Sequence, residues 1–217
     1  LSVAGHLLLY LMPVSLSHNM VDNSFYQKVV DNTNRLGHGL CVGLDPDIEK
    51  IPDHFDKSVT GIRNFLIDIV DVSSDYCVAY KPNLSFFEAL GVDGLLLLKD
   101  LIAYIPDKTP VILDGKRGDI GNTSAKQASY IFEYFNADAS TLHPYMGSDS
   151  LVPFFEYKDK WNFVLGLTSN PSSEEFERLG LLSGKLLFEK IIRSCAHWNE
   201  KYHNVGTVVG ATHDDMD

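Results

Sequence analysis

Short apolar runs rich in β-branched residues alternate with longer segments of helical periodicity, and this alternation constrains the fold more than any other feature of the chain. The six runs are LCVGLD (40–45), CVAYKPN (77–83), PVILDGK (110–116), ASTLHPY (139–145), FVLGLTS (163–169) and GTVVGAT (206–212). Strands that alternate with helices form βαβ units, whose strands lie parallel in one sheet. The pattern therefore predicts an α/β fold.

The segments between these runs have the spacing of amphipathic helices. Two sets of apolar residues each mark one buried helix face: Ile62, Phe65, Leu66, Ile69 and Val70, and later Leu187, Ile191, Cys195 and Trp198. Two helix starts are also indicated. Ser172 and Glu175 have the spacing of a capping box, and Asn122 or Thr123 can cap the helix that follows them.

A (β/α)8 TIM barrel fits this pattern better than a doubly wound sheet. Neither GxGxxG nor GxxxxGK[ST] follows any of the runs, so no nucleotide-binding loop supports the doubly wound alternative. Barrels of this type have about 250 residues and eight strands, and only six strands are visible here. We therefore expect residues 20–217 to form a barrel domain that is incomplete at its C-terminus, with residues 1–19 as an extension outside it.

Composition and charge narrow the possible partners. The net charge is −11 and the lysines and arginines are not clustered, which argues against a nucleic-acid-binding protein. The apolar stretch at residues 7–16 is too short to cross a bilayer, so no membrane span is expected. No HxH, HExxH or CxxC spacing occurs, so no metal site is expected.

The cysteines indicate the compartment. Cys41, Cys77 and Cys195 are scattered and odd in number, which favours a reducing compartment over a disulfide framework. Cys41 and Cys77 fit small buried apolar residues. We expect a cytoplasmic protein.

Polar and ionisable residues lie at the ends of several predicted strands. They are Asp45 on the first, Lys81 and Asn83 on the second, Asp114 and Lys116 on the third, and Thr168, Ser169 and Asn170 on the fifth. Barrel enzymes carry their catalytic groups at the carboxyl ends of strands, and side chains two positions apart share a face. The sequence therefore predicts a polar site where these strand ends meet.

Each of these residues also has a structural explanation when taken alone. Asp45 before a proline is a common turn former. Asp114 and Lys116 can form an ion pair of little net stabilisation, and Asp119 before a helix favours the positive end of the helix dipole. A structural explanation would require ionisable residues to occur independently at the ends of three strands. We therefore favour a functional site.

Five motifs together resemble the orotidine 5′-phosphate decarboxylase family. LDGKRGDIGNT resembles its D-x-K-x-x-D-I-x-x-T signature. GLDPD, KPNLSFFE, HPYMG and TSNPSS occur in the order and at the strand positions expected for that family. The residues within these motifs resemble those of the bacterial-type subgroup. The match runs from about Asp22 to the end of the chain.

The resemblance implies decarboxylation of orotidine 5′-monophosphate to UMP without a metal or organic cofactor. By the same resemblance, Lys116 protonates C6 of the pyrimidine after CO2 leaves, and Asp114 lies beside the substrate carboxylate. Lys81 pairs with Asp114 and the ribose. Asp45 holds ribose hydroxyls, with Asn83 nearby.

The resemblance also implies a homodimer with active sites at the subunit interface. Asp119, with Ile120 and Thr123, then reaches the neighbouring subunit's site and completes a Lys–Asp–Lys–Asp array. Ser169, with Thr168, contacts the amide edge of the pyrimidine.

The chain departs from the family pattern in one respect. The glycine-rich phosphate loop and glutamine after the seventh strand, and the arginine after the eighth, are absent, so no phosphate ligand is assigned. One alternative is a Mg²⁺-dependent sugar-phosphate barrel of the 3-keto-gulonate-6-phosphate decarboxylase or hexulose-phosphate synthase type, which shares D-x-K-x-x-D. Another is an inactive fragment, or a domain of a bifunctional UMP synthase fused to a phosphoribosyltransferase.

Overall fold

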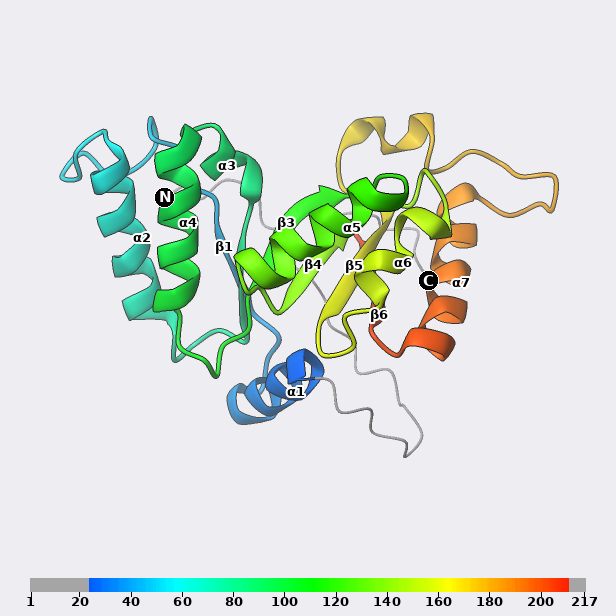
Figure 1. The fold of residues 1–217 in the computed structure, drawn as a ribbon, viewed down its shortest axis with the longest axis horizontal. Helices are drawn as coiled ribbons and strands as arrows, with labels where there is room; N and C mark the ends of the chain where they lie inside the picture. Colours follow the sequence, from blue (N-terminus) through cyan, green and yellow to red (C-terminus); the bar gives the residue numbers. More distant parts are fainter. Residues whose placement is uncertain (1–23, 211–217) are drawn as a thin grey trace.

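Six parallel strands lie side by side in chain order in the computed structural model, which describes residues 24–210 (Figure 1). They are β1 (Cys41–Leu44), β2 (Ala79–Pro82), β3 (Ile112–Arg117), β4 (Ala139–Leu142), β5 (Trp161–Leu167) and β6 (Val205–Val209). Single bridges at Tyr80–Val111 and Asn83–Asp114 join β2 to β3. Each predicted run overlaps one strand, so the prediction of an α/β barrel fold with six parallel strands is confirmed. The predicted extension at residues 1–19 lies outside the described residues.

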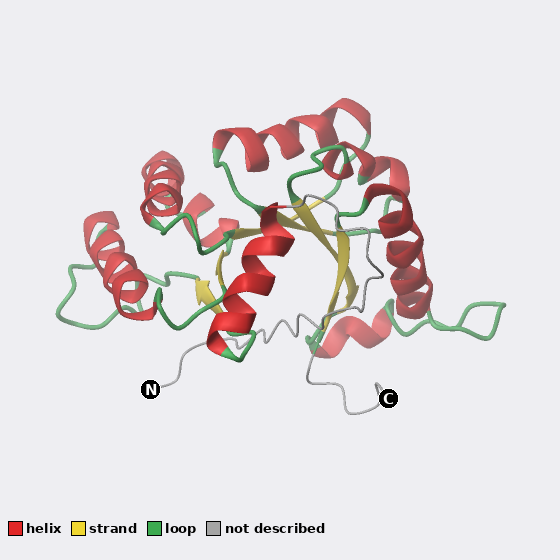
Figure 2. Cartoon of the chain, turned by 90° about the horizontal axis from the view of Figure 1, so that it is seen from below, coloured by secondary structure: helices red, strands yellow, loops and turns green. Residues whose placement is uncertain are grey.

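Most helices lie on the outer face of the curved sheet (Figure 2). The α-helices are α1 (Ser24–Leu36), α2 (Val59–Ser73), α3 (Leu84–Glu88), α4 (Gly91–Tyr104), α5 (Gly121–Ser129), α6 (Val152–Phe155) and α7 (Leu187–Tyr202). A π-helical turn, η1 (Tyr130–Tyr134), continues α5, and two short 3-10 helices are η2 (Ser148–Ser150) and η3 (Pro171–Glu175). No helix within residues 24–210 is both long and apolar enough to cross a membrane.

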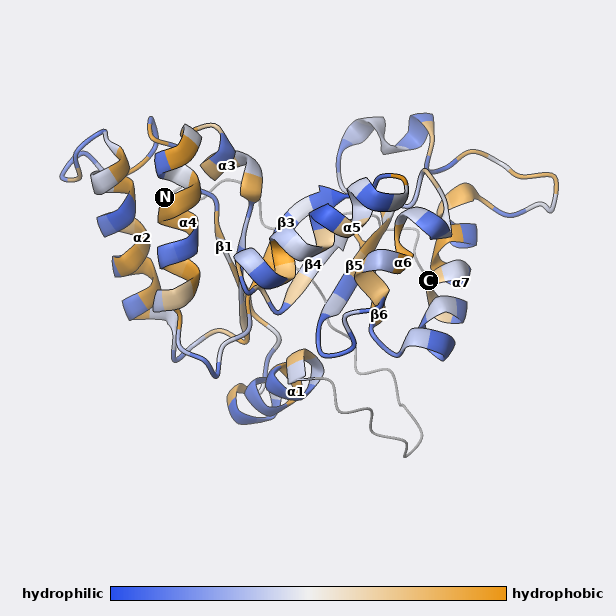
Figure 3. Ribbon diagram, viewed as in Figure 1, coloured by the Kyte–Doolittle hydropathy of each residue, from blue (hydrophilic) through white to orange (hydrophobic). Residues whose placement is uncertain are grey.

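The main core lies between the sheet and these outer helices. The predicted face of α2 is buried there through Ile62, Leu66 and Val70. Ser58 caps this helix by accepting a hydrogen bond from the Gly61 N–H at 3.1 Å. Figure 3 shows the apolar character of α2 and α4, which pack side by side.

A second, smaller core fills the inside of the curved sheet. Phe25 and Val29 of α1 pack there against buried residues in or next to the strands, namely Val78, Ala79, Ile112, Ala139, Phe163 and Val208. The rings of Phe25 and Phe163 meet edge to face with centroids 5.8 Å apart. Helix α1 therefore covers the amino-terminal ends of the strands, and the carboxyl ends lie at the opposite end of the barrel.

Two predicted helix starts are wrong. No helix follows a capping box at Ser172, because η3 is a short 3-10 turn with Pro171 in its first turn. The chain then forms a hairpin, in which Leu181 donates to the Lys185 carbonyl at 2.8 Å around Gly184, whose φ is 77°.

The cap predicted at Asn122 or Thr123 is also absent. Helix α5 begins at Gly121, and Ile120 occupies the N-cap position without a side-chain hydrogen bond. Thr123 donates its backbone N–H to the Ile120 carbonyl at 3.1 Å, so it lies inside the first turn.

Candidate active site

Asp114 on β3 is the centre of a charge cluster at the carboxyl ends of the strands. Its carboxylate oxygens lie 2.8 and 2.9 Å from the ammonium of Lys116, and one of them lies 3.3 Å from the ammonium of Lys81 on β2. Asp114 and Lys81 are 4% and 6% exposed, whereas the Lys116 side chain is 49% exposed. Two ammonium groups from neighbouring strands thus share one buried carboxylate, and one of the two faces solvent.

Strand alternation explains how Lys81 reaches this position. Tyr80 points outward, and its hydroxyl donates to the Val70 carbonyl of α2 at 3.1 Å. Successive side chains of a strand point to opposite faces. Ala79 and Lys81 therefore face the inside of the barrel, where Ala79 belongs to the inner core.

The electrostatic environment keeps Asp114 ionised. Burial acts to raise the pKa of this carboxyl, but the charge of Lys81 and hydrogen bonds from Lys116 and Thr141 outweigh burial and hold the pKa below its usual value. A negative charge is therefore fixed between the two lysines at neutral pH.

A bulge in β3 places Lys116. The pairing of β3 with β4 shifts between residues 113 and 117, so residues 114–116 lie opposite the single residue Thr141. Lys116 has a φ of 45°, which is uncommon for any residue other than glycine. Bulges re-aim side chains beside active sites, and such strained backbone persists where its surroundings enforce it. Here the bulge brings the Lys116 ammonium onto the Asp114 carboxylate.

Thr141 contacts both parts of the bulge and was not found by sequence reasoning. Its hydroxyl accepts a hydrogen bond from the Lys116 backbone N–H at 3.0 Å and donates to the Asp114 carboxylate at 2.7 Å. In the sequence it is one β-branched residue in an apolar run. The one sequence feature that could have indicated its role is a hydroxyl side chain on the strand next to the one that carries Asp114 and Lys116.

Asp45 and Asn83 lie together beside this cluster. The Asp45 carboxylate accepts a hydrogen bond from the Asn83 backbone N–H at 3.0 Å. Although Asp45 reaches solvent, loss of hydration raises its pKa, while the charge of Lys81 and the Asn83 N–H act to lower it. The Asn83 side chain caps α3 by accepting from the Ser85 N–H at 3.1 Å, so this side chain has a structural role as well.

Three predicted residues do not join the cluster within this chain. The Asp119 carboxylate accepts a hydrogen bond from the adjacent Ile120 N–H at 2.7 Å and pairs with neither lysine. Ile120 is 62% exposed, and Thr123 is exposed on the first turn of α5. These residues form an outward-facing rim next to the site.

The loop after β5 is held by an acidic residue that the sequence did not reveal. Glu177 accepts from the Thr168 backbone N–H at 2.7 Å and from its hydroxyl at 2.9 Å. The same hydroxyl lies 2.6 Å from the Asn170 side-chain oxygen. Ser169 is exposed between them. The side chain of Thr168 therefore orders the loop, and that of Ser169 faces solvent.

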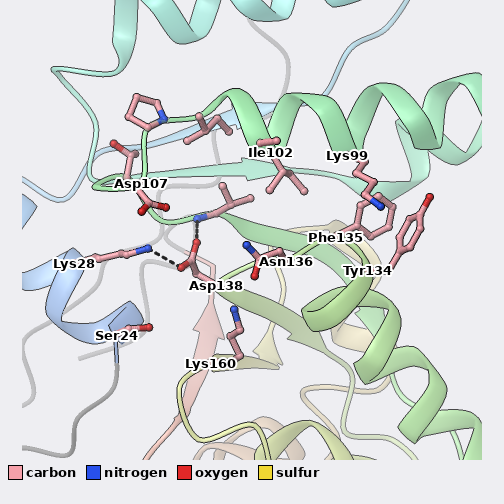
Figure 4. A pocket seen from close by; sticks show the side chains of 15 residues that line it. Ser24, Lys28, Lys99, Ile102, Asp107, Tyr134, Phe135, Asn136, Asp138 and Lys160 are labelled. Atoms are coloured by element: carbon pink, nitrogen blue, oxygen red, sulfur yellow. Dashed lines mark hydrogen bonds and ion pairs between the residues drawn. The ribbon is translucent and has the colours of Figure 1, made fainter.

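A cavity of about 450 Å³ lies at the other end of the barrel (Figure 4). Its lining includes Val111, Asp138 and Lys160, each of which directly precedes a strand, together with Lys28 of α1. It is separate from the charge cluster, so the two ends of the strands carry different polar features.

The sequence predicts that Cys41 and Cys77 are buried and that the chain holds no metal site. All three cysteines are free; Cys77 and Cys195 are buried, whereas Cys41 is only half-buried, contrary to its expected full burial. Burial nevertheless raises the pKa of the Cys41 thiol to about 12. Within residues 24–210, no three His, Cys, Asp or Glu side chains are grouped closely enough to hold a metal ion.

A parallel α/β barrel with clustered ionisable side chains at the carboxyl ends of its strands has the arrangement that is typical of barrel enzymes. Within that class the chain has a lysine–aspartate–lysine cluster built from two adjacent strands. The sequence profile of the Orotidine 5'-phosphate decarboxylase / HUMPS family matches residues 38–217, and the chain belongs to this family.

Individual relatives agree with the family profile. An orotidine 5'-phosphate decarboxylase of Herpetosiphon aurantiacus is 50% identical over 175 residues, which cover 80% of this chain and 65% of that protein. The structure of Leishmania donovani OMP decarboxylase is 39% identical, with a TM-score of 0.79, over 88% of this chain and 72% of that one. Leishmania donovani UMP synthase gives the same identity and TM-score over 40% of its length. The chain thus spans about two thirds of the length of the curated relative.

Proposed function

We propose that the full-length protein decarboxylates orotidine 5′-monophosphate to UMP. The observation that carries this proposal is the convergence of Lys81 and Lys116 on the buried carboxylate of Asp114, in a chain that belongs to this family. Relatives that are named orotidine 5'-phosphate decarboxylase support the same substrate.

The proposed reaction depends on fixed charges in the site, because the substrate offers no group into which the electrons can delocalise. Loss of CO2 from C6 of the pyrimidine leaves an electron pair on a ring carbon, with no adjacent carbonyl to accept it. Preorganised charged groups are then the main source of transition-state stabilisation. The half-exposed Lys116 ammonium is a group of this kind, and it also carries the proton that ends the step at C6.

Asp114 and Lys81 are assigned to catalysis together with Lys116, and the other residues of this end of the barrel to substrate binding. Asp114 lies beside the departing carboxylate, and Lys81 holds Asp114 and contacts the ribose. Asp45 binds ribose hydroxyls, with the Asn83 backbone fixing its carboxylate. Ser169 contacts the pyrimidine edge from the loop that Thr168 anchors to Glu177.

A homodimer completes the site in this proposal. Asp119 does not pair with the lysines of its own chain, and Ile120 beside it is exposed. Tyr145 and Met146, after β4, are also exposed apolar residues at this end of the barrel. We assign Asp119, Ile120 and Thr123 to the site of a second copy.

Subunit complementation tests this shared site. Lys116→Ala and Asp119→Ala proteins are each expected to be inactive, but mixed dimers contain one site with neither substitution. After co-refolding, about one quarter of wild-type activity is expected from random pairing in a two-fold dimer. No recovery in a mixture that is shown to exchange subunits would place Asp119 within its own chain's site.

The Lys116 substitution tests the function itself. The full-length wild-type protein should convert orotidine 5′-monophosphate to UMP, measured by the absorbance change and by CO2 release. Lys116→Ala should lower kcat by about 100- to 10,000-fold, as expected for loss of a positioned general acid. Lys99→Ala, which removes a lysine from the cavity at the other end of the barrel, is the matched control and should retain activity. Undiminished UMP formation by Lys116→Ala contradicts the assignment.

Alternatives within the family remain distinguishable by experiment. A sugar-phosphate enzyme that requires Mg²⁺ loses its activity to a chelator, whereas the proposed reaction does not. If the chain is a domain of a bifunctional UMP synthase, the full-length protein also makes orotidine 5′-monophosphate from orotate and phosphoribosyl pyrophosphate, through a fused phosphoribosyltransferase domain. The curated relatives favour the decarboxylase.

We place the protein in the cytoplasm, where its free cysteines stay reduced.

A further inference from the structure

We propose that Thr141 is a positioning residue that sets the geometry of Lys116 and Asp114 through one hydroxyl group. The inference rests on the proposed function for its kinetic consequence, but its structural part concerns only the shape of β3. It starts from the bulge, in which residues 114–116 lie opposite Thr141 alone.

The hydroxyl of Thr141 has a fixed direction. It accepts from the Lys116 backbone N–H at 3.0 Å and donates to the Asp114 carboxylate at 2.7 Å. A hydroxyl has a single proton, and both acceptor and donor capacities are used here by named partners. Thr141 is 2% exposed, so water does not compete for these two bonds.

These bonds act on two separate features of the catalytic lysine. The bond to the Lys116 N–H replaces a ladder hydrogen bond that the bulged strand cannot make to β4, and thereby holds φ at 45°. The bond to Asp114 fixes the rotation of the carboxylate that receives the Lys116 ammonium at 2.8 and 2.9 Å. One side chain therefore fixes both the backbone from which Lys116 starts and the group to which it points.

A purely structural role would have different consequences. Thr141 lies in a strand of four buried residues, and its neighbour Ser140 also has a buried hydroxyl. That hydroxyl donates to Asn162 on β5 at 3.3 Å and touches none of the charged residues. Ser140→Ala is therefore a matched control, since it removes a buried hydroxyl from the same strand without altering the cluster.

Kinetics of four full-length proteins test the proposal. Thr141→Val keeps the shape of the side chain and removes both hydrogen bonds, and Thr141→Ser keeps the hydroxyl. Thr141→Val should lower kcat by about 10- to 100-fold, because a misplacement of about 1 Å can cost roughly 100-fold. Its KM should change little, since substrate-binding groups are untouched. Thr141→Ser should restore most of kcat, and Ser140→Ala should match the wild type.

Crystal structures of the wild type and Thr141→Val give a readout that does not depend on activity. In the variant, Lys116 should leave the left-handed region, and its ammonium should move beyond hydrogen-bond distance of Asp114. An unchanged bulge and cluster overturns the proposal. So does full kcat in Thr141→Val, or a Thr141→Ser protein as slow as the valine variant. A wild-type protein without decarboxylase activity would refute the proposed function, and these structures would still decide the role of Thr141.

Discussion

Each end of the barrel has an aspartate that is partly or fully buried, and the partners of the two carboxylates differ. At the amino-terminal end, Asp138 accepts a hydrogen bond from the Val111 backbone N–H at 2.9 Å and pairs with one lysine, Lys28, at 3.0 Å (Figure 4). At the carboxyl end, the hydrogen-bond donors to Asp114 within residues 24–210 are side chains, and two of these are ammonium groups. Asp138 links α1 to the start of β3, whereas Asp114 holds the two charged lysine side chains of the cluster.

The backbone differs between the ends as well. Asp138 lies where the β3–β4–β5 ladders begin in regular register. Asp114 lies where that register shifts and Lys116 takes a φ of 45°. We conclude that regular pairing at one end stabilises the sheet, and that the irregularity at the other end serves the site.

Replacement of Lys81 should have a large effect on catalysis. Lys81→Ala removes the main charge that keeps the buried Asp114 ionised, so kcat/KM should fall by at least about 100-fold, as for other preorganised donors. Steady-state decarboxylation assays measure this. Lys28→Ala removes the corresponding lysine at the other end, and equal losses in both variants would abolish the distinction between the two ends.

Gly118→Ala should have an intermediate effect. A Cβ at this position would lie 2.9 Å from the His143 carbonyl oxygen and 3.2 Å from its ring, so the loop after β3 must shift. Overpacking of this kind typically costs about 1–3 kcal/mol of unfolding free energy. Denaturant unfolding measures the change, with Gly180→Ala as the control because nothing lies within 4 Å of its Cβ. A Gly118→Ala protein as stable as this control would show that the loop is not tightly held.

The dependence of stability on pH should show a smaller effect, with opposite signs for two aspartates. The folded-state pKa of Asp114 is lowered, so its contribution is present above the ordinary value of 3.8 and is lost as pH falls through the folded pKa. The pKa of Asp45 is raised, so stability increases as pH falls from above its folded pKa towards 3.8.

Asp114→Asn should therefore flatten the acid loss of stability, and Asp45→Asn should make it steeper. Urea unfolding between about pH 2 and 7 follows stability on both sides of the ordinary aspartate pKa. If both substitutions change the acid dependence in the same direction, the opposite environments assigned to these carboxyls are incorrect.

The fold and the composition of the cluster could be predicted from sequence because both depend on short-range patterns. Strand alternation places Lys81 on the inner face, and parallel strands bring their carboxyl ends to one edge. The positions of Asp45, Asn83 and Asp114 follow from the same two rules, and the structure brings them together.

The bulge and Thr141 could not be predicted, since they depend on a register shift between β3 and β4 that brings together Lys116 and Thr141, which are 25 residues apart in sequence. The false helix start at Ser172 has a local cause. Its capping-box spacing was correct, but Pro171 and the hairpin around Gly184 determine the backbone there. Sequence patterns thus identified the charged residues of the site, but not the backbone bulge and the hydrogen bonds that orient their side chains.

A parallel measurement on Asp114→Asn and Asp138→Asn tests the central claim most directly. Asp114→Asn should lower kcat/KM by at least about 100-fold, since both lysines lose the charge that positions them. Asp138→Asn should keep kcat/KM within about threefold and lower the unfolding free energy by about 1–2 kcal/mol, as for other lost hydrogen bonds. An Asp114→Asn protein that remains fully active, or an Asp138→Asn protein that folds normally but is equally impaired in catalysis, would contradict the account.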